Sequence, residues 1–343
     1  LFRSPYEQLT EYTKDCDFVY NLAAVHRPED KEDFNKVNFL LFDEILGLLE
    51  KNNNSCPVLY TSSIQVKQDT DYAKSKLRAE ESLILHGKKV EGKAIIYRLT
   101  NTFGKWARPN SHSVIATFCY NIARGLDINI SDLGYLMDFY YIDDVIDSFV
   151  AQLNGKVSPG LDDIYRLDNN LIYSITLGKL AELIDSFRLS RLNHSIPDMS
   201  DDFTKKLYST YMSYLPCDCF NYPLNMNKDE RGSFTEIFKT IDRGQFSVNI
   251  TKPGISKGDH WHNTKCEKFL VVSGKALIQF RKIDAEEIIK YPVSSEHMEI
   301  LDIPVGYTHN IINIGDDDLV TLMWANEIFN LDKMDTYHLM VDK

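Results

Sequence analysis

Four side chains of the kinds that bind transition metals lie near the C-terminal end of the chain. If they bind one ion together, the fold must bring all four to a single point. They are His260, His262, Glu267 and His309. His260 and His262 are two residues apart, so their rings lie on the same side of an extended strand. Glu267 follows a tight turn, and His309 must come from a separate strand. Three imidazole nitrogens and one carboxylate oxygen suit a divalent metal, most simply Zn²⁺, although other divalent metals also fit.

The residues around this set resemble both motifs of the cupin family. The first motif runs from Gly254 to Gly274, and the second is Pro304-Val-Gly306-Tyr-Thr-His309, with Met298 in place of the family's leading glycine. An alternative is that the histidines are ordinary residues of a β-sheet, which would explain a pair at positions i and i+2. This alternative would not explain the added glutamate, the glycines and the second segment. The resemblance implies a small β-barrel that holds one metal ion through the four side chains.

The size and charge of the chain limit the class of protein to which it can belong. Its 343 residues are enough for two domains with separate cores. A formal net charge of −12 argues against nucleic acid and an anionic membrane as partners, although a local cluster of Arg and Lys can still bind a nucleotide. No apolar run approaches the ~20 residues of a membrane span. The six cysteines form no regular framework and no signal peptide is evident, so we expect reduced thiols and a cytoplasmic location.

The texture of the chain changes along its length and predicts an α/β domain followed by an all-β domain. Short apolar runs alternate with helical stretches at first, which is typical of a parallel sheet flanked by helices. We expect strands at residues 18–24, 58–63 and 93–98. We expect helices at residues 37–51, 72–85 and 113–124, the last of them ended by Gly125. From about Phe234, short strands separated by Gly, Pro and Asp indicate a barrel. With residues 195–227 as the junction, we expect a Rossmann-type domain over residues 1–215 and a cupin barrel over residues 216–343.

One expected helix opens with a candidate catalytic pair, Tyr72 and Lys76. Their four-residue spacing places both side chains on one helical face. The Lys76 ammonium can lower the pKa of the phenol there and make Tyr72 a general acid or base. Ser63 ends the preceding strand, where its hydroxyl and that of Tyr72 can hold a carbonyl oxygen between them. Tyr-x-x-x-Lys alone is a weak signal, which a solvated helix start also explains.

Several ordered segments resemble the extended short-chain dehydrogenase/reductases. They are Asn21-Leu22-Ala23-Ala24, Thr61-Ser-Ser63, Tyr72-x-x-x-Lys76, Tyr97-Arg98-x-x-Asn101-x-Phe-Gly104 and Tyr141-Ile-Asp-Asp144. The resemblance implies an NAD(P)-binding domain with redox chemistry on a nucleotide sugar and a catalytic set of Ser63, Tyr72 and Lys76. The cofactor contacts that it implies are Arg3, Leu22, Ala23, Ala24, Tyr72, Lys76 and Leu99.

The glycine-rich phosphate loop of that family is not in the chain, whose earliest glycine is Gly47. The strand before the loop lies in the middle of such sheets, and its removal would leave its neighbours' backbone unpaired. We therefore expect a segment of about thirty residues to precede Leu1. Arg3 stands where an acid would bind the ribose of NAD, which favours NADPH over NADH. A merely exposed arginine is an equally good explanation.

Further segments resemble bacterial capsular-polysaccharide enzymes in which such a reductase is joined to a cupin; they lie at residues 110–120, 207–216, 229–236, 268–274 and 302–310. The resemblance implies a homodimer joined partly through the cupins. It also implies two activities on a UDP-linked 4-keto-6-deoxy amino sugar: the cupin inverts C3, and the reductase then reduces the C4 ketone with NADPH. The product is UDP-2-acetamido-2,6-dideoxy-L-talose, the precursor of UDP-N-acetyl-L-fucosamine.

The residues leave several points open. We expect Asn101, Lys105 and Arg108 to hold the sugar and its diphosphate, although a solvated loop also explains the two cations. Four protein ligands would close a zinc site, which favours a structural metal. The epimerising base has no motif of its own; Tyr307 and Lys257 lie near motif positions. Two other functions remain: a reductase whose cupin only dimerises, and a nucleotide-sugar-binding regulator without catalysis.

Overall fold

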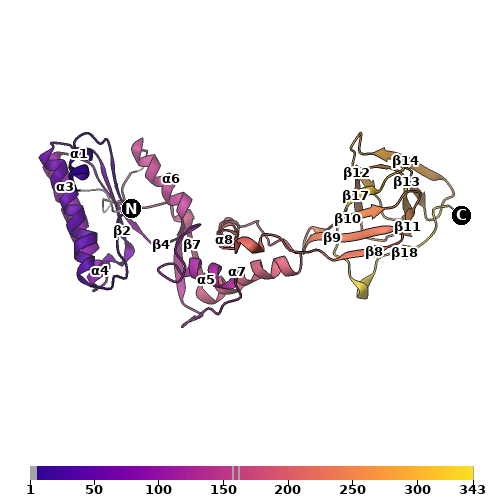
Figure 1. The fold of residues 1–343 in the computed structure, drawn as a ribbon, viewed down its shortest axis with the longest axis horizontal. Coiled ribbons are helices and arrows are strands. Elements are labelled where there is room, and N and C mark those ends of the chain that lie inside the picture. Colours follow the sequence, from indigo (N-terminus) through magenta and orange to yellow (C-terminus); the bar gives the residue numbers. More distant parts are fainter. Residues whose placement is uncertain (1–5, 157, 161–162, 343) are drawn as a thin grey trace. The chain divides into compact units, whose positions relative to one another are not determined.

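The structure, a computed structural model, describes residues 6–156, 158–160 and 163–342. Contacts divide the chain into two compact units. The first comprises the residues up to Asp185 together with Asp202–Leu215, and the second comprises Ser186–Asp201 together with the chain from Pro216 onward. In Figure 1 the first unit runs from indigo to magenta and the second is mostly orange to yellow.

The first unit contains a four-stranded parallel sheet in the order β1-β2-β3-β6. Its strands are β1 (Val19–Asn21), β2 (Val58–Ser63), β3 (Ala94–Leu99) and β6 (Ile164–Tyr165). β2 and β3 pair from Val58 opposite Ala94 to Ser63 opposite Leu99. Ser63 and Leu99 therefore end side by side at the carboxyl edge of the sheet, where α/β folds bind ligands.

Helices cover both faces of this sheet, because alternate side chains of a buried strand point to opposite sides. One face of β2 packs Val58 and Tyr60 against helices α3 (Leu41–Lys51) and α4 (Asp71–Val90), in a cluster with Phe42, Leu46, Leu49, Ala79 and Leu83. The other face packs Leu59 with Ile95, Tyr97, Val145 and Phe149. A second, three-stranded sheet has the order β4-β5-β7, with β4 (Asn101–Phe103), β5 (Leu136–Tyr141) and β7 (Ile172–Thr176).

The helices of the chain are α1 (Tyr6–Tyr12), α2 (Glu32–Asn35), α3 (Leu41–Lys51), α4 (Asp71–Val90), α5 (Val114–Ile122), α6 (Ile142–Leu153), α7 (Leu177–Leu192) and α8 (Asp202–Met212). A π-helical stretch, η1 (Lys36–Leu40), precedes α3, and short 3₁₀ turns lie at η2 (Ile64–Lys67), η3 (Asn169–Leu171), η4 (Cys217–Cys219) and η5 (Leu331–Lys333). Helix α4 begins where the Thr70 hydroxyl accepts a hydrogen bond from the backbone N–H of Ala73, a standard N-cap.

The predicted order of a Rossmann-type α/β domain and an all-β barrel is confirmed, and the structure gives detail on three local expectations. Helix α5 is regular to Ile122, and Gly125 (φ +64°) closes it as predicted: its N–H donates to the Ile122 carbonyl and the Leu126 N–H donates to the Asn121 carbonyl. The expected junction contains helix α8, whose buried Leu207 and Tyr211 pack with the first unit. The barrel begins at Met226, a little before the expected start at about Phe234, because strand β8 (Met226–Asp229) forms a hairpin with β9 (Gly232–Thr240).

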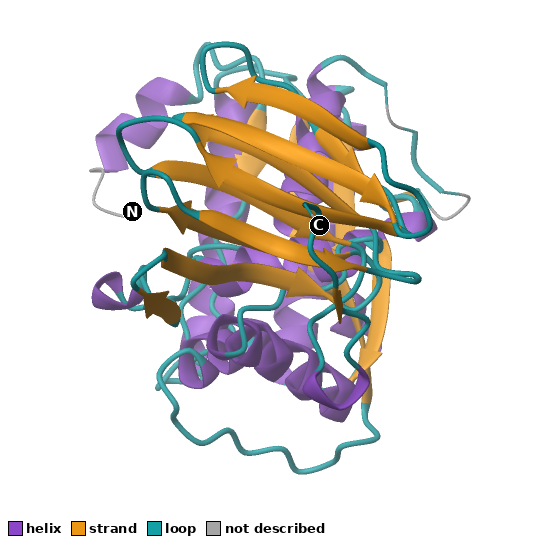
Figure 2. Cartoon of the chain, turned by 90° about the vertical axis from the view of Figure 1, so that its right-hand side faces the viewer, coloured by secondary structure: helices purple, strands orange, loops and turns teal. Residues whose placement is uncertain are grey.

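The second unit consists of two antiparallel sheets, whose strands are the broad orange arrows in the foreground of Figure 2. The six-stranded sheet has the order β15-β12-β17-β10-β9-β8, and the five-stranded sheet has the order β14-β13-β16-β11-β18. The remaining bounds are β9 (Gly232–Thr240), β10 (Gly244–Thr251), β11 (Ser256–Trp261), β12 (Glu267–Ser273), β13 (Lys275–Lys282), β14 (Ile288–Ser294), β15 (Leu301–Ile303), β16 (Tyr307–Asn313), β17 (Leu319–Ala325) and β18 (Tyr337–His338). A core that includes Phe269, Phe280 and Ile311 lies between the sheets.

Candidate active site and candidate metal centre

The four predicted metal ligands converge in the second unit. Strand β11 supplies His260, the turn after it His262, the start of β12 Glu267, and β16 His309. Their ligand atoms all lie within 4.8 Å of one another. Segments about forty residues apart in sequence are therefore brought to one point, as the spacing predicted, and all but His260 are buried.

The donor set fits a cation. Among the described residues, His262 Nε2, His309 Nε2 and Glu267 Oε2 are buried without a hydrogen-bond partner. Glu267 Oε2 lies 3.4 Å from His262 Nε2 and 3.3 Å from His309 Nε2, so the three atoms face a common point. Buried polar atoms without partners are costly, and a divalent ion at that point would satisfy them together.

The protonation states also suit metal binding. Burial, together with the neighbouring imidazole of His309, lowers the pKa of His260 to about 4. Burial opposes ionisation of Glu267, but His262, His309 and Lys265 together hold the pKa of its carboxyl well below the usual range. Neutral imidazole and ionised carboxylate are the forms that bind a metal.

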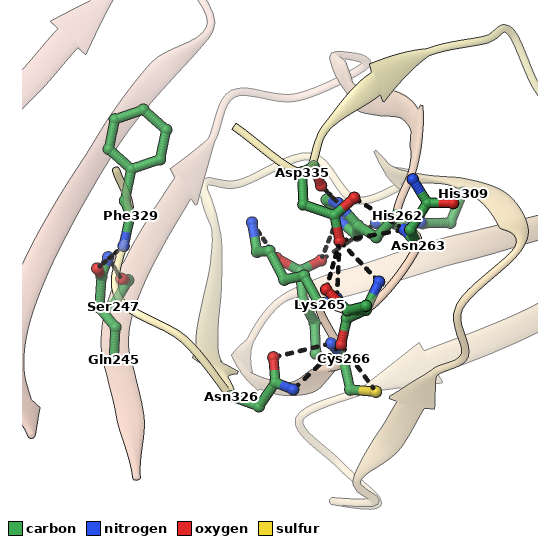
Figure 3. A network of polar contacts seen from close by, with 12 residues as sticks. Gln245, Ser247, His262, Asn263, Lys265, Cys266, His309, Asn326, Phe329 and Asp335 are labelled. Carbon is green, nitrogen blue, oxygen red and sulfur yellow. Dashed lines mark hydrogen bonds and ion pairs between the residues drawn. The ribbon is translucent and has the colours of Figure 1, made fainter. Parts of the chain in front are cut away.

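Asp335 fixes the turn that carries two of these ligands (Figure 3). Its carboxylate accepts hydrogen bonds from the backbone N–H groups of Asn263, Thr264 and Lys265, at 2.9, 2.7 and 3.0 Å. These donors hold the pKa of Asp335 well below its usual range despite partial burial. The backbone carbonyl of Asp335 also contacts His262 Nδ1, which leaves Nε2 to face the cluster. Sequence reasoning missed Asp335, which follows Thr264 by 71 residues.

The metal centre opens onto a cavity of about 700 Å³. Its wall includes His260, Glu267 and His309 and, from the β8–β9 hairpin and β11, the cations Lys228, Arg231 and Lys257. Of the two side chains near motif positions, Lys257 lines this cavity. Tyr307 instead packs beside the hydrophobic core.

In the first unit, Ser63, Tyr72 and Lys76 are brought together at the carboxyl edge of the parallel sheet. Ser63 ends β2, and its Oγ accepts a hydrogen bond from the backbone N–H of Gln65 at 3.1 Å. Tyr72 is the second residue of α4, and Lys76 lies one turn further on. Lys76 is buried, and its Nζ lies 6.0 Å from the centre of the Tyr72 ring. Ser63 and Tyr72 line a cavity of about 190 Å³ together with Leu99 and Asn101.

The expectation that Lys76 lowers the pKa of Tyr72 is wrong for this structure. Burial raises the pKa of Tyr72, and only a hydrogen bond with Ser63 acts in the opposite direction. Lys76 instead donates a hydrogen bond to the backbone oxygen of Thr61 at 2.8 Å, and burial lowers its own pKa to about 8. Tyr72 is consequently a protonated phenol at neutral pH, which is the form of a proton donor.

The structure brings only some of the other predicted cofactor- and substrate-binding residues close to the cavity of Tyr72. Leu22, Ala23 and Ala24 follow β1 at the same edge, and Leu22 is exposed. Lys105 forms an ion pair with Asp143 at 3.1 Å, and Arg108 is exposed; neither is among the described residues that line the cavity of Tyr72. Arg3 lies outside the described residues.

Two histidines that sequence reasoning missed border the same cavity. The ring of His26 lies 4.7 Å from that of Tyr72 and 5.6 Å from that of His112. Burial and the adjacent His112 lower the pKa of His26. No spacing rule joins His26 and His112 to Tyr72, because three separate segments supply them.

Taken together, the fold and the two sites define an extended short-chain dehydrogenase/reductase that carries a C-terminal cupin barrel. Residues 4–166 match the NAD dependent epimerase/dehydratase family, and residues 227–337 match the polysaccharide biosynthesis C-terminal domain. The UDP-glucose 4-epimerase of Thermotoga maritima shares the fold over 61% of the chain and 81% of its own, with a TM-score of 0.51 at 15% identity.

Two relatives cover nearly the whole chain. A crystal structure of the capsular polysaccharide assembling protein CapF from Staphylococcus aureus has a TM-score of 0.92 and 46% identity, over 99% of this chain and 91% of its own. The UDP-2-acetamido-2,6-beta-L-arabino-hexul-4-ose reductase of Pseudomonas aeruginosa is 41% identical over 96% of this chain and 87% of its own. The chain belongs to the CapF family. No helix among its described residues is both long and apolar enough to cross a membrane.

Proposed function

We propose that the chain is a bifunctional enzyme acting on a UDP-linked 2-acetamido-2,6-dideoxy-4-keto-hexose. Its cupin inverts C3, and its first unit then reduces the C4 ketone to give UDP-2-acetamido-2,6-dideoxy-L-talose. The observation that carries this proposal is that Ser63 and Tyr72 line one cavity, with the buried Lys76 Nζ 6.0 Å from the Tyr72 ring centre, in a chain that is 41% identical to a reductase of such a sugar.

The reduction follows from the geometry of Ser63 and Tyr72. Ser63 Oγ donates a hydrogen bond to the C4 carbonyl oxygen and polarises it. Tyr72, protonated because burial raises its pKa, gives its proton to the same oxygen as the alkoxide forms. A nicotinamide cofactor, when bound, would supply the hydride, and Arg3 favours NADPH as its form.

The residues at the carboxyl edge of the sheet fit that cofactor. The buried Lys76 ammonium uses one of its three donors on the Thr61 carbonyl, which leaves two for the hydroxyls of a ribose. Leu22, Ala23, Ala24 and Leu99 would provide small or apolar contacts beside it, and Asn101 would contact the sugar from β4.

Epimerisation is assigned to the cavity of the second unit. The C4 ketone acidifies the proton on C3, so inversion requires a base, stabilisation of the enolate and a proton donor. His260, His262, Glu267 and His309 would hold Zn²⁺, which supplies fixed positive charge and connects three strands. Reduction of C4 afterwards removes the acidity of C3 and retains the new configuration.

Incubation of the full chain with the UDP-4-keto sugar and NADPH, followed by NMR of the product, tests both activities. We expect NADPH oxidation and a talo-configured product, with solvent deuterium at C3 when the reaction is run in D₂O. Reduction without deuterium at C3 would support the second candidate, a cupin with structural and dimerising roles only. The four protein ligands at one point favour that candidate, because they leave a tetrahedral zinc ion no open position. If neither reduction nor exchange is observed, both candidates are excluded, and a non-catalytic binding protein remains.

A further inference from the structure

The wall of the cupin cavity carries an amine whose surroundings suit a base. Lys257 Nζ donates hydrogen bonds to Asn249 Oδ1 at 2.9 Å and to the Ile250 carbonyl at 2.8 Å. Both acceptors are uncharged, and they occupy two of the positions on the nitrogen. The third position on the nitrogen carries a proton in the ammonium form and a lone pair in the amine form, and this lone pair can accept a proton.

A β-bulge places this amine on the same face as the metal cluster. Lys257 and His260 are three residues apart, a spacing that would put them on opposite faces of a regular strand. Lys257 pairs with Ile311 and His260 pairs with His309, and the register shifts between Gly258 and His260. The extra residue turns His260 to the side of Lys257, so both line the cavity with His309 and Ile311.

The charges around Lys257 leave it without a carboxylate of its own. Asp229 lies nearby and raises the pKa of Lys257, but Arg231 holds that carboxylate by two contacts of 3.0 and 2.6 Å. Desolvation is the largest influence on Lys257 and lowers its pKa; Arg231 lowers it too. The other ionisable groups on this wall are Lys228, His260, Lys265, Glu267 and His309. Lys265 is itself paired with Glu267 at 3.1 Å.

We propose that Lys257 is the general base that removes the proton from C3 of the keto sugar, an inference that rests on the proposed epimerase activity. The C3–H bond breaks, its electron pair forms the C3–C4 double bond of the enolate, and the proton passes to Lys257 Nζ. Water admitted to the cavity then protonates C3 on the opposite face, and Lys257 returns its proton to solvent. Lys228 and Arg231 offset the negative charge of the enolate.

The test is C3 exchange in D₂O by the full-length chain, read by NMR without NADPH, for wild type, Lys257→Met and Lys257→Arg. We expect both variants to lose at least about a hundredfold in exchange rate, because removal of a general base costs that much and arginine stays protonated. C4 reduction of a substrate already inverted at C3 should continue in both. Lys252→Met, at an exposed lysine paired with Asp318, should exchange like wild type.

Each outcome decides one question. Exchange by Lys257→Met within about threefold of wild type would overturn the role of Lys257, since a lost base costs far more. Absence of exchange in wild type would refute the epimerase proposal, and Lys257 as its base with it. If Lys257→Met loses reduction as well, Lys257→Ala with added ethylamine decides: recovery of exchange supports the role, and no recovery overturns it. In wild type the exchange rate should rise with pH as the amine loses its proton, and this rise should be absent from both variants.

Discussion

At the scale of single residues, Lys76 has a proposed role in the reductase site, and its burial lowers the stability of the fold. It is one of the largest fully buried side chains of the chain, and burial lowers its pKa to about 8 from an ordinary value of about 10.4. The unfolded chain holds the proton between those pH values while the folded chain has released it. Stability therefore rises with pH across this window, and at pH 7 the full penalty of burying the charge is present.

Replacing Lys76 by methionine should consequently stabilise the first unit while it abolishes reduction. We expect a gain of about 2 kcal/mol at pH 7, the shift in pKa less the lost hydrogen bond to Thr61. The gain should vanish near pH 10. Hydrogen exchange of the β2 and β3 amides measures it, since these core amides exchange by global opening. Lys74→Met, at an exposed lysine paired with Asp69, should change little. A loss of stability in Lys76→Met at pH 7 would contradict the argument.

Tyr72 allows a second prediction at this scale. Tyr72→Phe removes the hydroxyl that we propose as the proton donor and keeps the ring beside His26. We expect the kcat of C4 reduction to fall by about a hundredfold or more, with C3 exchange in the second unit unchanged. Assays of NADPH oxidation and of deuterium incorporation on the same preparation measure the two activities. A Tyr72→Phe variant that keeps its reduction rate would remove Tyr72 from the mechanism.

At the scale of elements, the bulge in β11 gives the candidate metal centre its geometry. Gly258 has φ +120°, and a Cβ added there would meet the His309 carbonyl at 2.7 Å and Asn310 Cα at 2.8 Å. Asp259 takes φ +59°, and its carboxylate accepts hydrogen bonds from Asn310 Nδ2 and the Val341 N–H. The bulge is thereby held between β16 and the C-terminal segment.

Gly258→Ala should therefore damage the second unit more than an alanine at an uncrowded glycine. We expect a loss of about 2–4 kcal/mol, from backbone strain together with the clash against β16, and weaker binding of the proposed zinc ion. Gly254→Ala is the matched control. Gly254 has φ +73° with no atom within 4 Å of an added Cβ, so only strain of about 1 kcal/mol applies. Urea unfolding and zinc content compare them, and equal losses would show that the close approach to His309 is unimportant.

Local patterns predicted the elements and most of the site, and contacts between distant segments account for the rest. The strand at residues 58–63 and the spacing of Tyr72 and Lys76 on one helix depend only on residues close in sequence. The structure has this strand as β2 and this helix as α4, as expected. The bulge at Gly258, by contrast, depends on pairing with β16. The pKa of Tyr72 depends on burial by other segments, which a spacing rule does not report.

Asp335 is the clearest case of such a distant contact, and it yields a prediction about the turn before β12. Asp335→Ala removes the acceptor of three backbone donors that shape the turn between His262 and Glu267. Loss of a residue that orients metal ligands typically lowers affinity by about ten- to a hundredfold. We expect that loss in competition with a zinc chelator. Asp332→Ala, at an exposed aspartate in η5, serves as the control; equal affinities in both variants would contradict the role of Asp335.

At the scale of the whole molecule, one face of the six-stranded sheet suggests how the proposed homodimer forms. An almost wholly apolar groove of about 380 Å³ crosses this face, bordered by Phe246, Leu270, Ile300, Leu322 and Trp324. Phe246 lies opposite Trp324 between β10 and β17, and Leu322 lies opposite Leu270 between β17 and β12, so the side chains form two adjacent rows. An antiparallel sheet facing only water would carry polar residues there, and a second copy would cover the groove through a self-complementary contact.

Ile300→Asp should shift the chain from dimer to monomer, because it places a charge within that apolar contact. Ile300 is 64% exposed in the single chain, so the substitution leaves the fold of the monomer intact. Ile241→Asp is the matched control, since this isoleucine is 99% exposed in the β9–β10 turn and lies outside the groove. Light scattering coupled to size-exclusion chromatography should give a dimer for wild type and Ile241→Asp and a monomer for Ile300→Asp. A dimeric Ile300→Asp would place the interface elsewhere, and a monomeric wild type would refute the homodimer.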